Sequence, residues 1–113
     1  MMGMNNDAIF KALANRERRM LLDQLLKSNG LTLHELCESL FMTRQAVSKH
    51  LRILQKANMI GVVWRGREKL HFLNPAPIQA IYDRWMKKYH AHYIVALEQL
   101  KRNPELSTLK KEK

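Results

Sequence analysis

The sequence has few of the residues on which several classes of protein depend. A single cysteine, Cys37, stands among 113 residues, so no disulfide can form within the chain, in agreement with a reducing compartment. Four glycines leave little room for a loop that cradles phosphates. No nucleophile, base and orienting group occur together along the chain. We therefore do not expect an enzyme, and we expect no cofactor.

Long apolar runs are also lacking. The longest purely apolar stretches are a few residues, far below the roughly 20 that span a bilayer. The first residues lack the charged and apolar regions of a signal peptide. From these absences we expect a cytoplasmic protein with no membrane partner.

Acidic residues are outnumbered by basic ones. Twenty Lys and Arg against ten Asp and Glu give a formal net charge of +10, which favours a polyanionic partner. An anionic membrane surface would need a basic helix with a strongly lipophilic face or a lipidation signal, and neither is evident. Aromatic residues make up only 7% and offer few platforms on which unpaired bases could stack. Double-stranded DNA is the partner that the composition favours.

The length and pattern predict one domain over residues 1–103, followed by a mobile basic tail over residues 104–113. Helical spacing of apolar residues indicates a short helix over 7–14 and a second helix after Asn15. Thr32 and Glu35 fit a capping box that starts a third helix, and Thr43 fits the N-cap of a fourth. Two short helices joined by a tight turn predict a helix-turn-helix unit.

The fourth predicted helix, residues 44–57, is the most informative part of the chain. Its apolar residues fall on one side, and its basic and hydrogen-bonding residues fall on the other. Arg and Gln pair with guanine and adenine edges in the major groove, and the neighbouring polar groups can reach bases or phosphates. A solvated surface helix is the alternative. The DNA-binding residues predicted here are Thr43, Arg44, Gln45, Ser48, Lys49, His50 and Arg52.

After Asn58 the apolar period changes from 3.6 to 2. Ile60, Val62 and Trp64 alternate, then a turn containing Gly66 follows, then Leu70 and Phe72 alternate. This pattern predicts a β-hairpin. Its tip carries basic side chains that could contact phosphates or a narrow minor groove, although they could instead serve only solubility. We predict DNA contacts by Arg65, Arg67 and Lys69.

A long helix is predicted after the break at residues 74–77. Its apolar stripe is about six turns long, more than a domain of this size can easily cover, and it predicts a homodimer interface joined by the first helix. Two recognition helices in a dimer would read a palindromic site. The predicted interface residues are Ile9, Phe10, Leu13, Ile78, Ile81, Trp85, Tyr89, Tyr93, Ala96 and Leu100.

This order of elements, with Gln-Ala-Val-Ser-Lys-His-Leu-Arg at residues 45–52 and Arg-Gly-Arg-Glu-Lys-Leu-His at residues 65–71, resembles the ArsR family of bacterial regulators. The similarity spans roughly residues 7 to 100. The resemblance implies a mainly α winged helix-turn-helix with a small β-hairpin, dimeric through its terminal helices. It also implies a sequence-specific DNA-binding transcriptional regulator that represses from an operator. Asn58 stands where the family commonly has glycine, and asparagine tolerates the left-handed backbone required there.

Many members of that family sense metals, but this chain resembles a subgroup that lacks the usual ligands. The family's helix-three site needs two or three thiolates, and only Cys37 is present. The family also has a zinc-type site on its last helix. Asp83, His90 and His92 lie on the corresponding helix here, but their spacing does not match that site. His34 and Cys37 could form half of a metal site shared between subunits, but we interpret Cys37 as a small core residue. We expect no metal and leave the effector unknown.

Two further histidines and one alternative function remain. His50 is expected to pack at the edge of the recognition helix, with a phosphate contact possible, and His71 is expected at the surface or facing DNA. A non-specific architectural DNA-binding protein is the alternative function, for which apolar wedge residues at the DNA face would be the signature.

Overall fold

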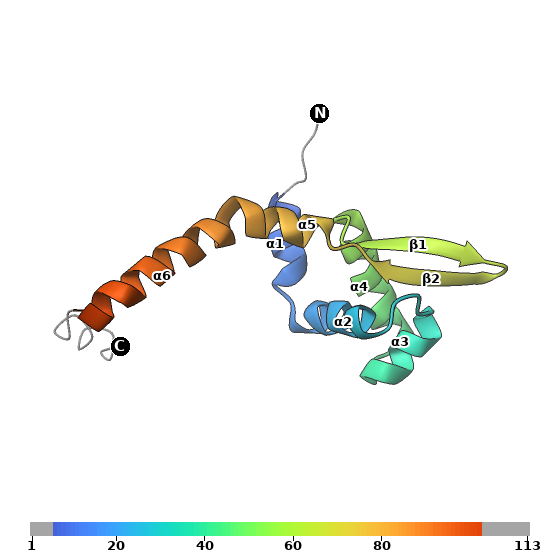
Figure 1. Cartoon of the computed structure of the whole chain (residues 1–113). Helices are drawn as coiled ribbons and strands as arrows, with labels where there is room; N and C mark the ends of the chain where they lie inside the picture. Colours follow the sequence, from blue (N-terminus) through green and yellow to red (C-terminus); the bar gives the residue numbers. More distant parts are fainter. Residues whose placement is uncertain (1–5, 103–113) are drawn as a thin grey trace, which may run out of the picture. The chain divides into compact units, whose positions relative to one another are not determined.

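The computed structural model describes residues 6–102 (Figure 1), so the tail predicted over residues 104–113 lies outside the described residues. The elements follow in the order α1 (Asn6–Leu13), α2 (Arg16–Lys27), α3 (Leu33–Leu40), α4 (Arg44–Lys56), β1 (Ile60–Arg65), β2 (Glu68–Leu73), α5 (Ala76–Ile81), the π-helical segment η1 (Tyr82–Met86) and α6 (Lys87–Arg102). The chain forms two compact units, one ending at Ile78 and the other beginning at Gln79. The prediction of a mainly α protein with a small hairpin is confirmed.

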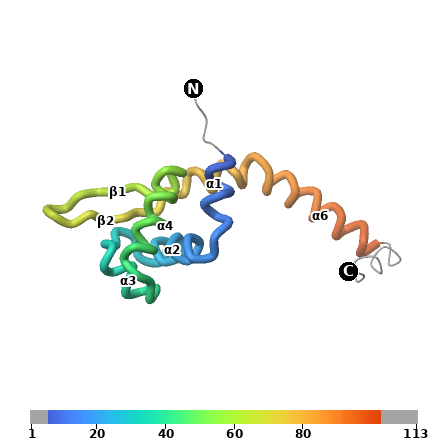
Figure 2. The backbone as a smooth tube through the Cα atoms, turned by 180° about the vertical axis from the view of Figure 1, so that it is seen from behind, coloured from blue at the N-terminus to red at the C-terminus, as the bar shows by residue number. Residues whose placement is uncertain are grey.

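The first unit encloses an aliphatic core. The helices α2, α3 and α4 contact one another in this unit (Figure 2), and they contribute most of the deeply buried side chains. Burying a side chain of this size contributes about 1.5–3 kcal/mol each. The side chains that are least exposed come from five helices and one connection: Ile9, Leu21, Leu25, Leu36, Val47, Leu54, Met59 and Pro77.

Short polar side chains begin the helices of this unit, as the sequence predicts. Asn15 caps α2 by accepting a hydrogen bond from the Arg18 backbone N–H at 3.0 Å. Thr32 and Glu35 form the capping box that starts α3, and Thr43 accepts from the Ala46 N–H at 3.2 Å to start α4. Each cap satisfies a backbone donor that the first turn of a helix leaves without a partner.

The turn between α3 and α4 contains a backbone outlier. Phe41 ends α3 in the left-handed conformation, with φ 54° and ψ 45°, and its side chain is 95% exposed. A bulky residue rarely adopts this conformation, because Cβ crowds the following carbonyl. Asn58, after α4, has φ 62°, which confirms the left-handed turn expected there.

The hairpin is a two-stranded antiparallel sheet in which Ile60 pairs with Leu73 and Arg65 pairs with Glu68. Two residues connect the strands. Gly66 has φ 63°, and Arg67 is not among the residues with positive φ, the pattern of a type II′ turn with glycine at its first central position. Ile60 and Leu70 are buried, whereas Trp64 is 64% exposed. The register places Ile60 and Trp64 on one face and Leu70, which pairs with Val63, on the other, so the apolar residues of the two strands do not form a single buried face.

The second unit is helical throughout its described part. One uninterrupted helical stretch from α5 through η1 to α6 confirms the predicted long helix, but the sequence did not indicate the π-helical segment. No side chain of η1 or α6 is buried within the described chain, although many are apolar. The exposed large apolar residues of this stretch are Ile78, Tyr82, Met86, Tyr89, Tyr93, Ile94 and Val95.

Candidate nucleic-acid interface

The exposed face of α4 carries the side chains that the sequence assigned to base recognition. Arg44, Gln45, Lys49 and Arg52 are exposed and Ser48 is half-buried. The opposite face is held in the core by the buried Val47, Leu51, Leu54 and Ala57. Burial of the apolar face fixes the orientation of the polar face, because rotation of α4 about its axis would expose its leucines to water. The five polar side chains share a shallow hollow with Leu33.

The N-terminus of α4 adds a site suited to an anion. Free backbone N–H groups and the helix dipole favour negative charge at a helix N-terminus. Thr43 lies there, exposed, with its oxygen accepting from Ala46 and its hydroxyl hydrogen able to donate outward. Arg44 follows directly and is also exposed. The predicted DNA contact by Thr43 is compatible with its role as the cap.

A groove of about 590 Å³ separates α4 from the hairpin. Positive charge lines both of its walls, from Arg44 and Arg52 on α4 and from Arg67 and Lys69 on the hairpin. The first turn of α3 forms its third side. The full lining is Thr32, Leu33, His34, Glu35, Arg44, Ser48, Leu51, Arg52, Gln55, Trp64, Arg67, Glu68, Lys69 and His71.

Trp64 belongs to this groove and was not assigned a functional role from the sequence. Its alternation with Ile60 and Val62 predicted only that it lies in a strand of the hairpin, and its side chain lies toward the far end of the hairpin and is exposed. The Lys69 ammonium lies 6.0 Å from the centre of the Trp64 ring. A cation beside an aromatic face in a basic groove suits a sugar-phosphate strand, which offers apolar and anionic surface together.

Arg65 is less free than the other basic residues of the hairpin. Its guanidinium donates to the Glu68 carboxylate at 3.2 Å, and both side chains are largely exposed. An exposed pair of this kind is weak, so a phosphate could compete for Arg65. Arg65 does not line the groove, whereas Arg67 and Lys69 do. Its predicted DNA contact stays a prediction.

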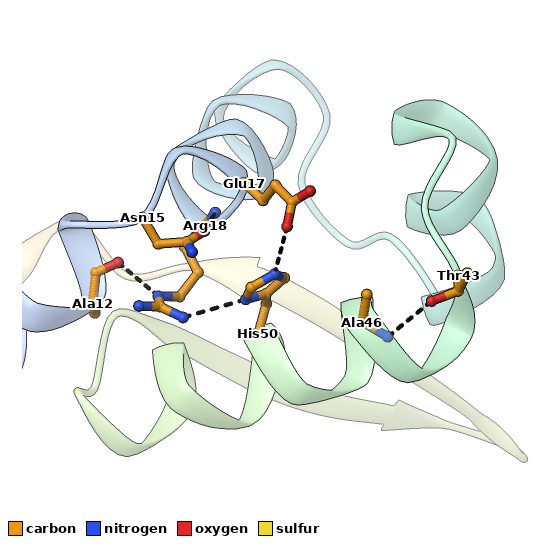
Figure 3. Close-up of polar contacts among 7 residues, drawn as sticks. All are labelled: Ala12, Asn15, Glu17, Arg18, Thr43, Ala46 and His50. Atoms are coloured by element: carbon orange, nitrogen blue, oxygen red, sulfur yellow. Dashed lines mark hydrogen bonds and ion pairs between the residues drawn. The ribbon is translucent and has the colours of Figure 1, made fainter.

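His50 does not belong to the DNA-facing set, and this part of the prediction is wrong. Its side chain is only 11% exposed and both ring nitrogens have partners within the protein (Figure 3). Nε2 lies 3.0 Å from the Glu17 carboxylate and Nδ1 lies 3.3 Å from an Arg18 guanidinium nitrogen. The expectation that His50 packs beside the helix is correct. These partners lie more than 30 residues away in sequence, which is why local periodicity could not show them.

His71 is likewise not at the surface. It is 4% exposed, and its ring Nδ1 donates to the Leu31 carbonyl oxygen at 2.9 Å. Burial lowers the pKa of His71, the hydrogen bond to Leu31 opposes that effect, and the charge of Lys69 lowers the pKa further. His71 thus attaches the hairpin to the connection between α2 and α3.

The described residues include no cluster of three side chains able to hold a metal ion. His34 instead contacts Glu38 one turn along α3 at 3.2 Å, and both are exposed. Cys37 is half-buried, which agrees only in part with the expectation of a small core residue. The absence of a resident metal stays a prediction. Within residues 6–102 no helix is long and apolar enough to cross a membrane.

The residues assigned to the dimer interface divide into two groups. Ile9 and Ile81 are buried within the single chain, at 1% and 9% exposure, so they cannot supply an open surface. For these two the prediction is wrong, because periodicity marks an apolar face without saying what covers it. Phe10, Ile78, Tyr89, Tyr93 and Ala96 are exposed, and Leu13, Trp85 and Leu100 are half-buried.

A capped recognition helix, a preceding helix across a tight turn and a basic hairpin behind it define a winged helix-turn-helix protein. The sequence pattern described as "Bacterial regulatory protein, arsR family" matches residues 15–61. The chain belongs to the ArsR family, and it is a DNA-binding transcriptional regulator.

Two proteins of Bacillus subtilis strain 168 are similar over most of their length. The uncharacterized HTH-type transcriptional regulator YuzN is 37% identical over 89 residues, covering 74% of this chain and 97% of YuzN. The transcriptional repressor SdpR is 33% identical over 86 residues, covering 76% of this chain and 91% of SdpR. Among solved structures, an ArsR-like transcriptional regulator from Rhodococcus sp. RHA1 superposes with a TM-score of 0.67 at 26% identity, covering 86% of this chain and 90% of that one.

Proposed function

We propose that this protein is a cytoplasmic transcriptional repressor that binds a palindromic operator as a homodimer and catalyses no reaction. The observation that carries the proposal is the exposed polar face of α4, backed by a buried leucine face and continued by the basic groove. The name of SdpR, a transcriptional repressor, supports repression over activation.

Side-chain chemistry indicates which residues read bases and which bind the DNA backbone. Arg44 and Gln45 lie at the N-terminal end of α4, where recognition helices usually meet base edges, and both can pair with a base in bidentate fashion. Ser48, Lys49 and Arg52 extend the same face by one and two turns. Arg67 and Lys69 hold the backbone and add affinity without sequence information.

The exposed apolar stripe of η1 and α6 supports the dimer. Tyr89 is 67% exposed and Tyr93, one turn further along α6, is 54% exposed, and so many large apolar side chains in one helical stretch usually mark a protein interface. Two symmetric copies would place two recognition helices about one turn of DNA apart, which matches a palindrome.

One observation favours a second candidate, a non-specific architectural protein. Val63 and Trp64 are both more than half exposed on the hairpin, and architectural proteins insert apolar side chains of this kind between base steps. Such a protein would show little preference among duplexes.

Competition separates the two candidates. Fragments of the source genome that the purified protein retains would be sequenced, and the best duplex would be challenged with bulk duplex DNA. Repression from an operator predicts a preference of at least about 1,000-fold for the selected duplex at physiological salt. Equal competition by bulk DNA would favour the architectural role.

A further inference from the structure

Arg18, on the first turn of α2, is the point where three helices are joined. Its Nε donates to the Ala12 carbonyl at 2.9 Å, and one terminal nitrogen donates to the Lys11 carbonyl at 3.2 Å. Both carbonyls belong to the last turn of α1, where the helix itself supplies no donors. The other terminal nitrogen lies 3.3 Å from Nδ1 of His50, in the middle of α4.

The chemistry of these groups fixes the direction of the hydrogen bonds. A guanidinium has donors only, so Nδ1 of His50 accepts from Arg18. Nε2 then carries the ring hydrogen and donates to Glu17 at 3.0 Å. His50 therefore spans two adjacent residues of α2 with its two nitrogens, as Figure 3 shows. This arrangement resists rotation of α4 about its axis, because rotation would separate both contacts.

The contact with α4 distinguishes Arg18 from its neighbour. Arg19 also binds the end of α1, donating to the Leu13 carbonyl at 2.6 Å, but no hydrogen bond joins its side chain to α4 among the contacts of the described residues. The sequence thus contains two adjacent arginines that hold α1, of which one also holds the recognition helix. Arg19 is the natural control.

We propose that Arg18 and His50 are positioning residues that couple the placement of α1 to the placement of the recognition helix, so that DNA affinity depends on the seating of α1. Neither side chain contacts DNA in this scheme, and both act by setting the direction in which Arg44 and Gln45 point. An event that displaces the end of α1 would withdraw the Arg18 guanidinium from His50 and reduce DNA binding. The inference rests on the proposed DNA-binding function of α4.

The test is a double-mutant cycle in DNA affinity. The probe is the duplex that the wild-type protein selects from a random-sequence pool, and each variant is measured at a temperature where circular dichroism shows it fully folded. We expect Arg18→Ala and His50→Phe each to weaken binding about tenfold, with the double variant no weaker than either single one, since contacting residues are not additive. Arg19→Ala should bind within about twofold of wild type.

Two further readouts separate positioning from a DNA contact and from simple loss of stability. The slope of log affinity against log salt should not change in Arg18→Ala, because no phosphate contact is lost. His50→Gln keeps one acceptor and one donor and should recover most of the binding that His50→Phe loses.

The inference is overturned if His50→Phe binds like wild type, if Arg19→Ala is as defective as Arg18→Ala, or if the losses multiply in the double variant. Arg44→Ala in the same series distinguishes this failure from failure of the proposed function. A loss of sequence preference in Arg44→Ala alongside an unaffected His50→Phe removes only the positioning role. An unchanged preference in both Arg44→Ala and Gln45→Ala removes the recognition surface itself.

Discussion

The Leu31 carbonyl oxygen accepts two hydrogen bonds from His71, one from its backbone N–H at 2.9 Å and one from its ring Nδ1 at 2.9 Å. The Gly30 and Leu31 N–H groups return two bonds to the His71 carbonyl, at 2.9 and 3.2 Å. These contacts attach β2 to the connection between α2 and α3. They therefore fix the position of the hairpin, whose other end carries Arg67 and Lys69.

The buried ring of His71 makes folding sensitive to pH. Because burial lowers its pKa below the ordinary value of 6.5, the unfolded chain takes up a proton at a higher pH than the folded chain. The contribution to stability is therefore complete above pH 6.5 and is lost as the pH falls from 6.5 toward the lower folded-state pKa. One proton corresponds to a slope of at most about 1.4 kcal/mol per pH unit.

Urea unfolding at several pH values between 5 and 8 would measure this slope. His71→Asn retains a donor for Leu31 but cannot titrate, so its free energy of unfolding should depend less on pH over that window than that of wild type. Equal pH dependence in the two proteins would show that His71 does not contribute.

Because Phe41 has a left-handed backbone conformation, we expect its replacement by glycine to stabilise the folded protein. Phe41→Gly removes the Cβ that crowds the backbone at φ 54°, and the lost ring was already 95% exposed. The strain relieved is roughly 1–2 kcal/mol, offset in part by the greater freedom of glycine in the unfolded chain. We expect a net gain of about 1 kcal/mol in thermal or urea unfolding. Phe41→Ala keeps the Cβ and is the control; if both variants shift equally, backbone strain is not the cause.

Arg67 and Lys69 should contribute affinity but no sequence preference. Arg67→Ala and Lys69→Ala are each expected to weaken binding to selected and bulk duplexes by the same factor, and to reduce the salt slope by about 1. Titrations at several salt concentrations would check this. Lys27→Ala, at the end of α2 and away from the groove lining, removes the same charge and should leave the slope unchanged. A change of base preference in Arg67→Ala would contradict a backbone role.

A substitution at Tyr89 tests whether α6 forms the proposed dimer interface. It is 67% exposed in α6, within the apolar stripe, and a charge there would have to be buried in an interface. Tyr89→Glu is therefore expected to convert the protein to monomers in light scattering and to reduce its affinity for a palindrome. Lys88→Glu introduces the same carboxylate one position earlier on the exposed surface of α6. If both variants keep the mass of wild type, the interface lies elsewhere.

Features decided by neighbouring residues could be predicted from the sequence. The caps Asn15, Thr32 and Thr43 each act on a backbone N–H three residues ahead, so spacing alone indicated them. The turn at Gly66 and the two faces of α4 were predicted on the same basis. The polar face of α4 follows from its leucines, because burial of one face leaves the other exposed.

Features decided by distant residues could not be predicted. His50 was assigned a DNA contact, and His71 a place at the surface or facing DNA, because nothing near them in sequence indicates Glu17, Arg18 or Leu31 as partners. Ile9 carries the same helical spacing whether a second copy or its own chain covers it. Trp64 follows the alternation of a packed strand, but the hairpin extends past the helices that would bury it.

In the proposed function, the N-terminal face of α4 reads base sequence. The base preferences of Arg44→Ala and Gln45→Ala test this role, and they are obtained by selecting duplexes from a random pool and comparing each position with wild type. Each variant is predicted to lose about 1–3 kcal/mol of discrimination at one base pair of each half-site and to keep the others. If both variants select the same sequences as wild type with the same discrimination, α4 does not read the DNA.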